Sequence, residues 1–279
     1  MKTFTTRKDL SDFLLTQKAA GKVLGLVPTM GALHAGHVSL INIARENSDV
    51  VICSIFVNPT QFNDPADLER YPRPVNDDIA KLEEAGCDVL FLPPVEEMYK
   101  QDEQWHLELG EVENILEGKF RPGHYQGVTQ IVSKLFDIIK PDIAFFGQKD
   151  FQQFKIISRM TVLLKFPVKL VMCPIVREES GLALSSRNIH LSDKEHQQAL
   201  ALSKALQITK NNFTEKPLEA LKADAIEFLN SSEGVELEYF EICNADDLQP
   251  VHSKNVQHIV ALVAAYVGKT RLIDNLILK

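Results

Sequence analysis

Short apolar runs alternate with helix-like stretches between residues 23 and 173, and this alternation constrains the fold more than any other feature. The apolar runs are residues 23–27, 49–57, 88–92, 142–147 and 168–173. The stretches with helical periodicity include residues 37–48, 75–86, 126–140 and 151–164. Strands that are apolar throughout indicate a sheet covered by helices on both faces. The pattern therefore predicts an α/β fold with a parallel sheet and right-handed crossovers.

The pattern of apolar and polar residues changes beyond about residue 175. A polar turn rich in Gly and Ser at 177–188 precedes helical patterns near 192–210 and 217–230. Three strand-like runs then follow, at residues 236–242, 257–267 and 270–278. We therefore expect two domains, an α/β domain over residues 1–175 and a smaller α+β domain over residues 176–279.

Charge and cysteine usage narrow the class of protein. Lys and Arg total 30 against 38 Asp and Glu, a net charge of −8, so we expect neither nucleic acid nor a membrane as a partner. The cysteines lack the spacing of a zinc site and lie mostly in apolar runs, which predicts buried thiols: Cys53, Cys87, Cys173 and Cys243. The N-terminus lacks the apolar core of a signal peptide, which predicts a cytoplasmic protein.

The first segment that contains candidate functional residues is 27–40, VPTMGALHAGHVSL. An apolar strand ends there in a Pro/Gly loop, and a helix is predicted to begin near Gly36. Ligands of open α/β sheets bind at the carboxyl ends of strands, and helix starts favour phosphate. His34 and His37 are three residues apart, so both rings can face one ligand. Ordinary capping and packing roles for both histidines remain open at this point.

The second segment, residues 145–153, again follows an apolar strand and precedes a helix. It places Lys149 and Asp150 at the same edge of the predicted sheet. The ammonium of Lys149 suits charge that develops on a transferring phosphoryl group. Asp150 can accept a hydrogen bond from a nucleotide hydroxyl, or it can simply cap the helix. A solvated Lys149 is the plain alternative.

The third segment, residues 182–188, clusters hydroxyls and a guanidinium after a turn. Ser185, Ser186 and Arg187 together have the donors needed to hold a triphosphate. An ordinary polar turn is the alternative interpretation.

The fourth segment, residues 56–74, is polar and rich in Pro after a strand, which is typical of a functional loop. Gln61 in this loop and Gln153 in the predicted helix after residue 150 can hold a small polyhydroxylated acid through their amides. Uncharged amides would leave the carboxylate of such a substrate nucleophilic.

Together the four segments resemble the pantothenate synthetase (pantoate–β-alanine ligase) family. Their H-x-G-H signature, here His34, Ala35, Gly36 and His37, is shared with the nucleotidylyltransferase superfamily. Residues 71–93, 120–136 and 174–188 extend the resemblance over nearly the whole chain. It implies a Rossmann-like N-terminal domain that binds nucleotide and pantoate, a smaller C-terminal lid domain and a homodimer. It also implies an Mg²⁺-dependent reaction of ATP, pantoate and β-alanine through a pantoyl-adenylate, giving pantothenate, AMP and pyrophosphate.

The resemblance also implies roles for individual residues. His34, His37, Lys149 and Arg187 are the expected catalytic residues, with His37 as the proton donor. Gln61 and Gln153 are expected to bind pantoate, and Gln61 also β-alanine. The expected ATP-binding residues are Met30, Gly31, Ala32, Leu33, His34, Ala35, Gly36, His37, Gly147, Gln148, Lys149, Asp150, Val176, Leu184, Ser185, Ser186 and Arg187.

A magnesium ligand and a further pocket residue are implied less directly. Asp77 resembles the family carboxylate near Mg²⁺, and one carboxylate with phosphates suits this hydrated ion. Asp78 is the alternative ligand, or both are ordinary residues of a first helical turn. His124 is expected to border the pantoate pocket.

Two other functions share part of this pattern. A nucleotidylyltransferase would stop after the first step and release a nucleotide-capped product. A non-catalytic nucleotide-binding module would keep the fold without the reaction. The residue types at His37, Lys149 and Arg187 argue against the non-catalytic module. The final form of the nucleotide distinguishes the ligase, which releases free AMP, from the nucleotidylyltransferase.

Overall fold

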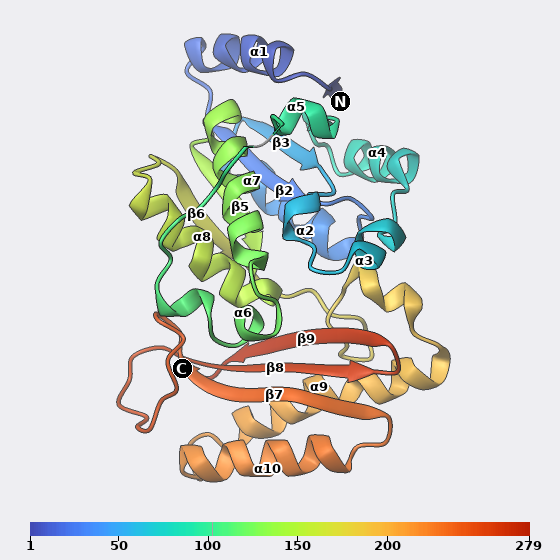
Figure 1. Ribbon diagram of the computed structural model, residues 1–279, viewed down its shortest axis with the longest axis vertical. Helices are drawn as coiled ribbons and strands as arrows, with labels where there is room; N and C mark the ends of the chain where they lie inside the picture. The colour runs from blue at the N-terminus through green and yellow to red at the C-terminus, as the bar shows by residue number, and fades with distance from the viewer. Residues whose placement is uncertain (102) are drawn as a thin grey trace. The chain divides into compact units, whose positions relative to one another are not determined.

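The computed structural model describes residues 1–101 and 103–279, which form two compact units (Figure 1). The first comprises Met1–Gly147 and Gln152–Cys173, and the second comprises Gln148–Phe151 and Pro174–Lys279. A short piece that follows a strand of the first unit thus belongs with the second. The predicted division after residue 175 and the lid role of the C-terminal domain stay predictions.

The first unit contains a parallel sheet, as the apolar runs predict. Its strands in the described residues are β1 (Lys2–Phe4), β2 (Leu24–Thr29), β3 (Val50–Ile55), β4 (Val89–Phe91), β5 (Ile143–Gly147) and β6 (Lys169–Cys173). Their order across the sheet is β1-β4-β3-β2-β5-β6, and all neighbours are parallel. Strand β1 was not predicted, because a run of three residues carries too little periodicity to stand out.

Helices cover both faces of this sheet. Those in and around the first unit are α1 (Arg7–Ala19), α2 (Ala35–Asn47), α3 (Pro65–Arg70), α4 (Val75–Glu84), α5 (Val95–Met98), α6 (Glu117–Phe120), α7 (His124–Ile139) and α8 (Phe151–Leu163). Alternate residues of β3 enter two separate cores. Val50 and Ile52 share one core with α1, α7 and α8, whereas Val51 and Cys53 share the other with α2 and α4. The buried thiols are confirmed for all four cysteines.

The strand order reverses between β2 and β5. From β2 the chain runs outward through β3 and β4, and from β5 it runs the other way to β6. Such a switch point opens a crevice at the carboxyl ends of the two strands, where ligands of doubly wound folds bind. Residues 30–34 follow β2 directly, and Gly147 is the last residue of β5. The expected nucleotide segments thus begin at this edge.

The second unit is a three-stranded antiparallel sheet with two helices packed on it (Figure 1). Its elements are α9 (Asp193–Asn211), α10 (Leu218–Ser231), β7 (Val235–Asn244), β8 (Ile259–Val267) and β9 (Thr270–Ile277). The core joins Leu206 of α9 and Leu229 of α10 to Phe240 and Val263 of the sheet. The predicted fold class, a parallel α/β sheet followed by a smaller α+β part, is confirmed. None of the described helices is both long and apolar enough to cross a membrane.

Candidate active site

The loop after β2 has an unusual backbone. Gly31 and Ala32 both adopt left-handed conformations, with φ of 84° and 51°. For Ala32 this costs about 1–2 kcal/mol, so the surroundings must compensate. Asp78 of α4 does so, because its two carboxylate oxygens accept the backbone N–H groups of Ala32 and Leu33 at 2.8 and 2.7 Å. A Cβ on Gly31 would lie 3.0 Å from the same carboxylate, which explains the glycine.

Helix α4 holds this loop through a second residue. The ammonium of Lys81 donates to the Leu33 carbonyl at 2.7 Å. Asp78 is only 1% exposed, and both of its oxygens are engaged by the loop. Sequence reasoning offered Asp78 as a metal ligand and missed this role. The available signal was periodicity, since Asp78 lies four residues before the buried Leu82 on the apolar stripe of α4.

The two histidines of the H-x-G-H signature cap the helix that follows. Helix α2 begins at Ala35 with His34 as its N-cap. The Gly36 N–H donates to Nδ1 of His34 at 3.1 Å, and the His34 N–H donates to Nδ1 of His37 at 3.3 Å. The ring centroids are 4.1 Å apart. The capping role that the sequence left open is therefore real.

This capping fixes how each imidazole is protonated. A ring nitrogen that accepts a backbone N–H carries no proton of its own. In the neutral form, both His34 and His37 therefore carry their proton on Nε2, so that each ring is a donor at that atom. The same contacts that start the helix thus prepare two N–H donors beside its N-terminus, which favours anions.

Gln61 lies in the short helix η1 (Pro59–Gln61) and is 8% exposed. Its Oε1 accepts from Nδ2 of Asn58 at 3.1 Å, and its Nε2 lies 3.0 Å from Sδ of Met30. Its backbone carbonyl accepts from Nδ1 of His124 at 2.8 Å, while Arg121 lies 3.1 Å from the other ring nitrogen. His124 therefore holds the backbone of Gln61. The structure brings Met30 and Gln61, both predicted site residues, into contact.

A second layer of residues behind Gln61 was not predicted. Asn58 is 1% exposed, and its Nδ2 also donates to the Gly127 carbonyl of α7 at 3.0 Å. The Tyr99 hydroxyl donates to Oδ1 of Asn58 at 2.6 Å, and burial raises the pKa of Tyr99 to about 12, so it stays a donor. A Cβ at Gly127 would lie 2.3 Å from the Thr60 carbonyl, so this approach of α7 to η1 requires glycine. These buried contacts give Gln61 a fixed orientation.

A pocket of about 310 Å³ lies at the carboxyl ends of β3 and β4. Met30, Phe56, Val57 and Leu92 are among its mainly apolar lining residues. Arg73 also lines it, but its guanidinium donates to the backbone carbonyls of 68, 69 and 71. Met30 thus lies between this pocket and Gln61.

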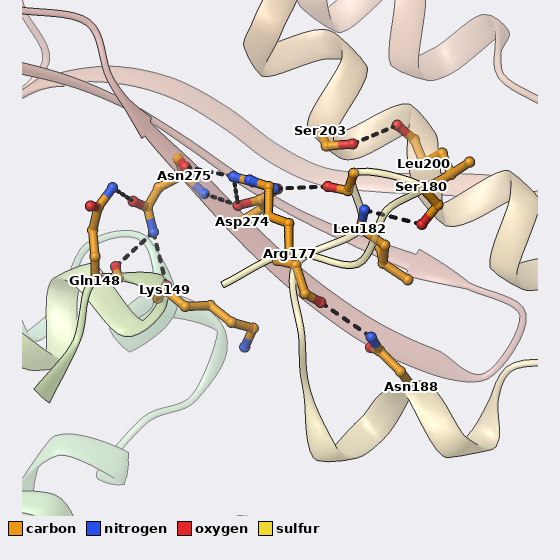
Figure 2. A network of polar contacts seen from close by, with 12 residues as sticks. Gln148, Lys149, Arg177, Ser180, Leu182, Asn188, Leu200, Ser203, Asp274 and Asn275 are labelled. Carbon is orange, nitrogen blue, oxygen red and sulfur yellow. Dashed lines mark hydrogen bonds and ion pairs between the residues drawn. The ribbon is translucent and has the colours of Figure 1, made fainter. Parts of the chain in front are cut away.

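In the second unit, the segment after β5 is held by a buried amide. Gln148 and Lys149 belong to η3 (Gln148–Asp150), and their carbonyls each accept from Nδ2 of Asn275 at 2.9 Å. The Gln148 side chain donates back to Oδ1 of Asn275 at 3.1 Å. Figure 2 shows the Lys149 side chain extending away from this network. Asp150 is exposed.

The remaining predicted nucleotide residues lie around a small hairpin in the same unit. The Leu184 N–H donates to the Val176 carbonyl at 3.0 Å, so these two residues are directly paired. Ser185 then caps η4 (Ser186–His190) by accepting the Arg187 N–H at 3.3 Å. Val176, Leu184 and the Ser185–Arg187 segment are therefore one local structure.

Two further predicted residues lie on helices, Gln153 on α8 and Asp77 on α4. Gln153 is half-buried on α8, whereas its neighbour Gln152 is 2% exposed and binds the backbone of residues 112, 115 and 117. Gln152 is thus structural. Asp77 is exposed in the first turn of α4.

Comparison with known proteins gives the arrangement a context. The family model described as pantoate-beta-alanine ligase matches residues 2–277. A pantothenate synthetase of Porphyromonas gingivalis is 46% identical over 277 residues, covering 99% of both chains. One of Thermotoga petrophila is 46% identical over 280 residues, covering 100% of both.

Solved structures agree with the sequence relatives. The pantothenate synthetase of Thermus thermophilus has a TM-score of 0.92 at 39% identity and covers 99% of both chains. The pantoate-beta-alanine ligase of Francisella tularensis, complexed with beta-gamma ATP and beta-alanine, has a TM-score of 0.82 at 36% identity, covering 99% of this chain and 97% of that one. Family model, relatives and folds coincide over almost every residue, and on that ground the chain belongs to the pantoate–β-alanine ligase family.

Proposed function

We propose that this protein condenses (R)-pantoate with β-alanine at the expense of ATP, giving pantothenate, AMP and pyrophosphate through a pantoyl-adenylate. The observation that carries the proposal is the histidine pair at the start of α2. Nδ1 of both rings is committed to backbone N–H groups, so Nε2 of both is a donor beside the helix N-terminus. This arrangement suits the phosphates of a nucleotide, and the matching relatives are named as pantothenate synthetases.

ATP is assigned to three segments in this proposal: the loop after β2, the segment after β5 and the hairpin that leads into η4. The residues from Met30 to His37 bind its phosphates through the loop backbone and the two Nε2–H groups. Lys149 adds a positive charge, and Ser185, Ser186 and Arg187 add hydroxyl and guanidinium donors. Gly147 to Asp150 line the same nucleotide, Val176 borders the adenine with backbone groups, and Leu184 belongs to the same site.

Pantoate is assigned to Gln61 and Gln153. The fixed amide of Gln61 is suited to hydroxyl groups, and it leaves the substrate carboxylate without a cationic clamp. One carboxylate oxygen of pantoate attacks the α-phosphorus of ATP in line, and the bond to the bridging oxygen breaks with its electron pair leaving on pyrophosphate. Lys149, His34 and Arg187 stabilise the charge that develops, and His37 donates a hydrogen bond from Nε2 to the leaving group.

The second step forms the amide. The amine of β-alanine, held near Gln61, attacks the carbonyl carbon of the pantoyl-adenylate. The carbon–oxygen bond to AMP then breaks, AMP leaves with the electron pair, and the nitrogen loses a proton. Water competes with the amine for the same carbonyl, so the C-terminal domain, residues 176–279, is assigned a lid role that excludes it.

Magnesium is part of the proposal, and the residues present fit it. Within the described residues, no group of three or more His, Cys, Asp or Glu side chains is arranged to hold a metal. Mg²⁺ commonly needs only one or two carboxylates, with phosphates and water as the other ligands. On the first turn of α4, Asp78 is engaged by the loop while Asp77 is exposed, so Asp77 would hold the ion. When bound, Mg²⁺ would neutralise charge on the phosphates.

A homodimer and a cytoplasmic location complete the proposal. The homodimer is implied by the family resemblance, and the cytoplasmic location is carried over from the expectation drawn from the sequence. Size-exclusion chromatography with light scattering tests the first, and fractionation of cells tests the second.

Product analysis tests the reaction directly. Purified protein is incubated with ATP, Mg²⁺ and pantoate, with and without β-alanine, and the products are identified by mass. We expect pantothenate, AMP and pyrophosphate in equal amounts with β-alanine, and none of the amide when Mg²⁺ is chelated. A stable nucleotide-capped product that β-alanine does not consume would indicate a nucleotidylyltransferase instead. No turnover of ATP in any mixture would contradict an enzymatic role.

A further inference from the structure

Two consecutive polar residues of β9, Asp274 and Asn275, are almost fully buried, at 4% and 1% exposure. Buried polar side chains are costly unless their hydrogen bonds are made, so such a pair needs partners. Consecutive side chains of a strand leave it in opposite directions. Figure 2 shows that Asn275 reaches toward Gln148 and Lys149, whereas Asp274 meets Arg177.

Both ends of the Asn275 side-chain amide form hydrogen bonds with residues of η3. The two protons of Nδ2 go to the carbonyls of Gln148 and Lys149, both at 2.9 Å, and Oδ1 accepts from the Gln148 side chain at 3.1 Å. An amide has two such protons, so none is left over. The contact is with the peptide groups on both sides of the Lys149 Cα. It therefore sets the direction in which the Lys149 side chain leaves the backbone.

Asp274 holds the other nucleotide segment through Arg177. Its two oxygens accept from both terminal nitrogens of Arg177, at 2.6 and 2.9 Å. The guanidinium also donates to the Gly181 carbonyl at 3.1 Å, across the hairpin that pairs Val176 with Leu184. Asn188 of η4 then donates to the Ala183 carbonyl at 3.2 Å. Asp274 is thus linked to η4 by a continuous series of bonds.

We propose that Asp274 and Asn275 are positioning residues of the triphosphate site, each holding on β9 one of the two segments that the second unit contributes. Asn275 directs Lys149, and Asp274 directs Ser185 to Arg187 through Arg177 and the hairpin. This inference rests on the proposed function, because it assigns both segments to ATP. It goes beyond that function in placing the control of both segments on two adjacent residues of the C-terminal strand.

The choice of an amide at 275 has a chemical reason. Two carbonyl oxygens face this side chain, so it must donate twice, and a carboxylate has nothing to donate. A carboxylate would also lie beside the backbone that carries the Lys149 ammonium and would compete with phosphate for that charge. Asn275→Asp is therefore a substitution of nearly the same shape that reverses the interaction.

A double-mutant cycle tests whether Asn275 acts through Lys149. The measured quantity is the single-turnover rate of pyrophosphate release from ATP and pantoate with Mg²⁺. We expect Lys149→Ala to lower it by about 10²-fold and Asn275→Asp by about 10- to 10²-fold, since small misplacements of catalytic groups are costly. If Asn275 acts through Lys149, adding Asn275→Asp to Lys149→Ala should change the rate by less than about 2-fold.

A matched control and a second variant keep this test decisive. Thr270 is also buried on this strand, five residues before Asn275, so the rate of Thr270→Val should equal that of the unsubstituted protein. If Asn275→Asp does not fold, Asn275→Ala removes the donors without adding charge and takes its place in the cycle. If the rate losses of the Lys149 and Asn275 variants multiply in the double variant, the inference is overturned, while the proposed function still holds. A Lys149→Ala protein with a normal rate would contradict both.

The proposed action of Asp274 on residues 185–187 predicts a different effect, on the KM for ATP. Asp274→Asn should raise the KM for ATP by about 10-fold, and this effect should vanish in an Arg187→Ala background but persist in a Lys149→Ala background. General loosening of the unit would instead lower all rates in both backgrounds. Equal coupling of Asp274 to Lys149 and to Arg187 would therefore contradict the division of labour proposed here.

Discussion

The loop after β2 and the segment after β5 both precede a helix, yet they are held by opposite chemistry. The first turns through left-handed residues and presents backbone N–H groups, which the Asp78 carboxylate accepts. The second presents the carbonyls of Gln148 and Lys149, to which the Asn275 amide donates. A near-isosteric pair of residues, Asp and Asn, thus does the same work at two places. Which of them is required depends on the backbone groups that each loop leaves unsatisfied.

The difference also determines where charge lies. A carboxylate beside the first loop is compensated by two N–H donors, and Lys81 of the same helix binds the adjacent Leu33 carbonyl. A neutral amide beside the second adds no charge next to Lys149, and the neighbouring carboxylate of Asp274 is paired with Arg177. The comparison predicts that exchanging Asp and Asn at either position is harmful, although the shape of the side chain hardly changes.

The largest effect is expected at His37, which both caps the helix and, in our proposal, contacts phosphate. In His37→Asn, Oδ1 of the new side chain replaces Nδ1 and can still accept the His34 N–H, but the Nε2–H donor is gone. We expect pyrophosphate release to fall by at least about 10²-fold, with thermal stability nearly unchanged. Stopped-flow kinetics and calorimetry measure the two quantities.

His37→Ala is the control that separates the capping role of His37 from its role as a donor to phosphate. It removes both the cap and the donor, so it should lose activity to the same extent and also lose about 1 kcal/mol of stability. A His37→Asn protein that turns over at a near-normal rate would show that the histidine acts only as a cap, and the first loop would then have no catalytic donor at this position.

The fold was largely predictable because it depends on periodicity. The strands β2 to β9 lie within a few residues of the apolar runs, since continuous burial leaves a continuous apolar sequence. β1, α1 and the short helices α3, α5 and α6 were not predicted. All of these except α1 span only three to six residues, which carry no clear period. The helix start near Gly36 was placed within one residue of Ala35.

The candidate site was predictable only in part. The H-x-G-H segment and Lys149 follow strands and carry reactive groups, so position and chemistry pointed the same way. Asp78, Asn58 and Asn275 act by holding backbone that lies 45, 69 and 126 residues away in sequence. Nothing in the local sequence encodes such a partner, although Asp78 and Asn275 both lie where an apolar residue is expected.

The next largest effect is expected from Asp78→Asn, the exchange opposite to Asn275→Asp. One N–H of the loop would face an NH₂ group, leaving a buried donor unsatisfied, and the left-handed Ala32 would lose its compensation. We expect a loss of about 2 kcal/mol of stability in the first unit. Asn275→Ala should cost a similar amount in the second unit, because it leaves two carbonyls without a donor.

Thiol labelling at pH 8 reports each unit separately. Burial raises the pKa of Cys87 to about 11 and that of Cys243 to about 12, so the thiols become reactive only when their surroundings open. Asp78→Asn should accelerate the labelling of Cys87 by about 30-fold, as about 2 kcal/mol implies, and Cys243 much less. Equal acceleration of both thiols would mean that the two units open together. The stability of the first loop could then not be measured separately from that of the second segment.

The smallest effect is expected from Lys81→Met, which tests whether the first loop needs both of its contacts to α4. Methionine keeps the apolar stem of the half-buried lysine but removes the donor to the Leu33 carbonyl, for an expected loss of about 1 kcal/mol. Lys22→Met is the matched control, because Lys22 is exposed and its ammonium donates to the Gln17 side chain, so its change should stay within about 0.5 kcal/mol. Chemical denaturation measures both variants. Equal stabilities for the two would mean that the carboxylate of Asp78 alone holds the loop, and the two segments of the site would then each depend on one buried side chain.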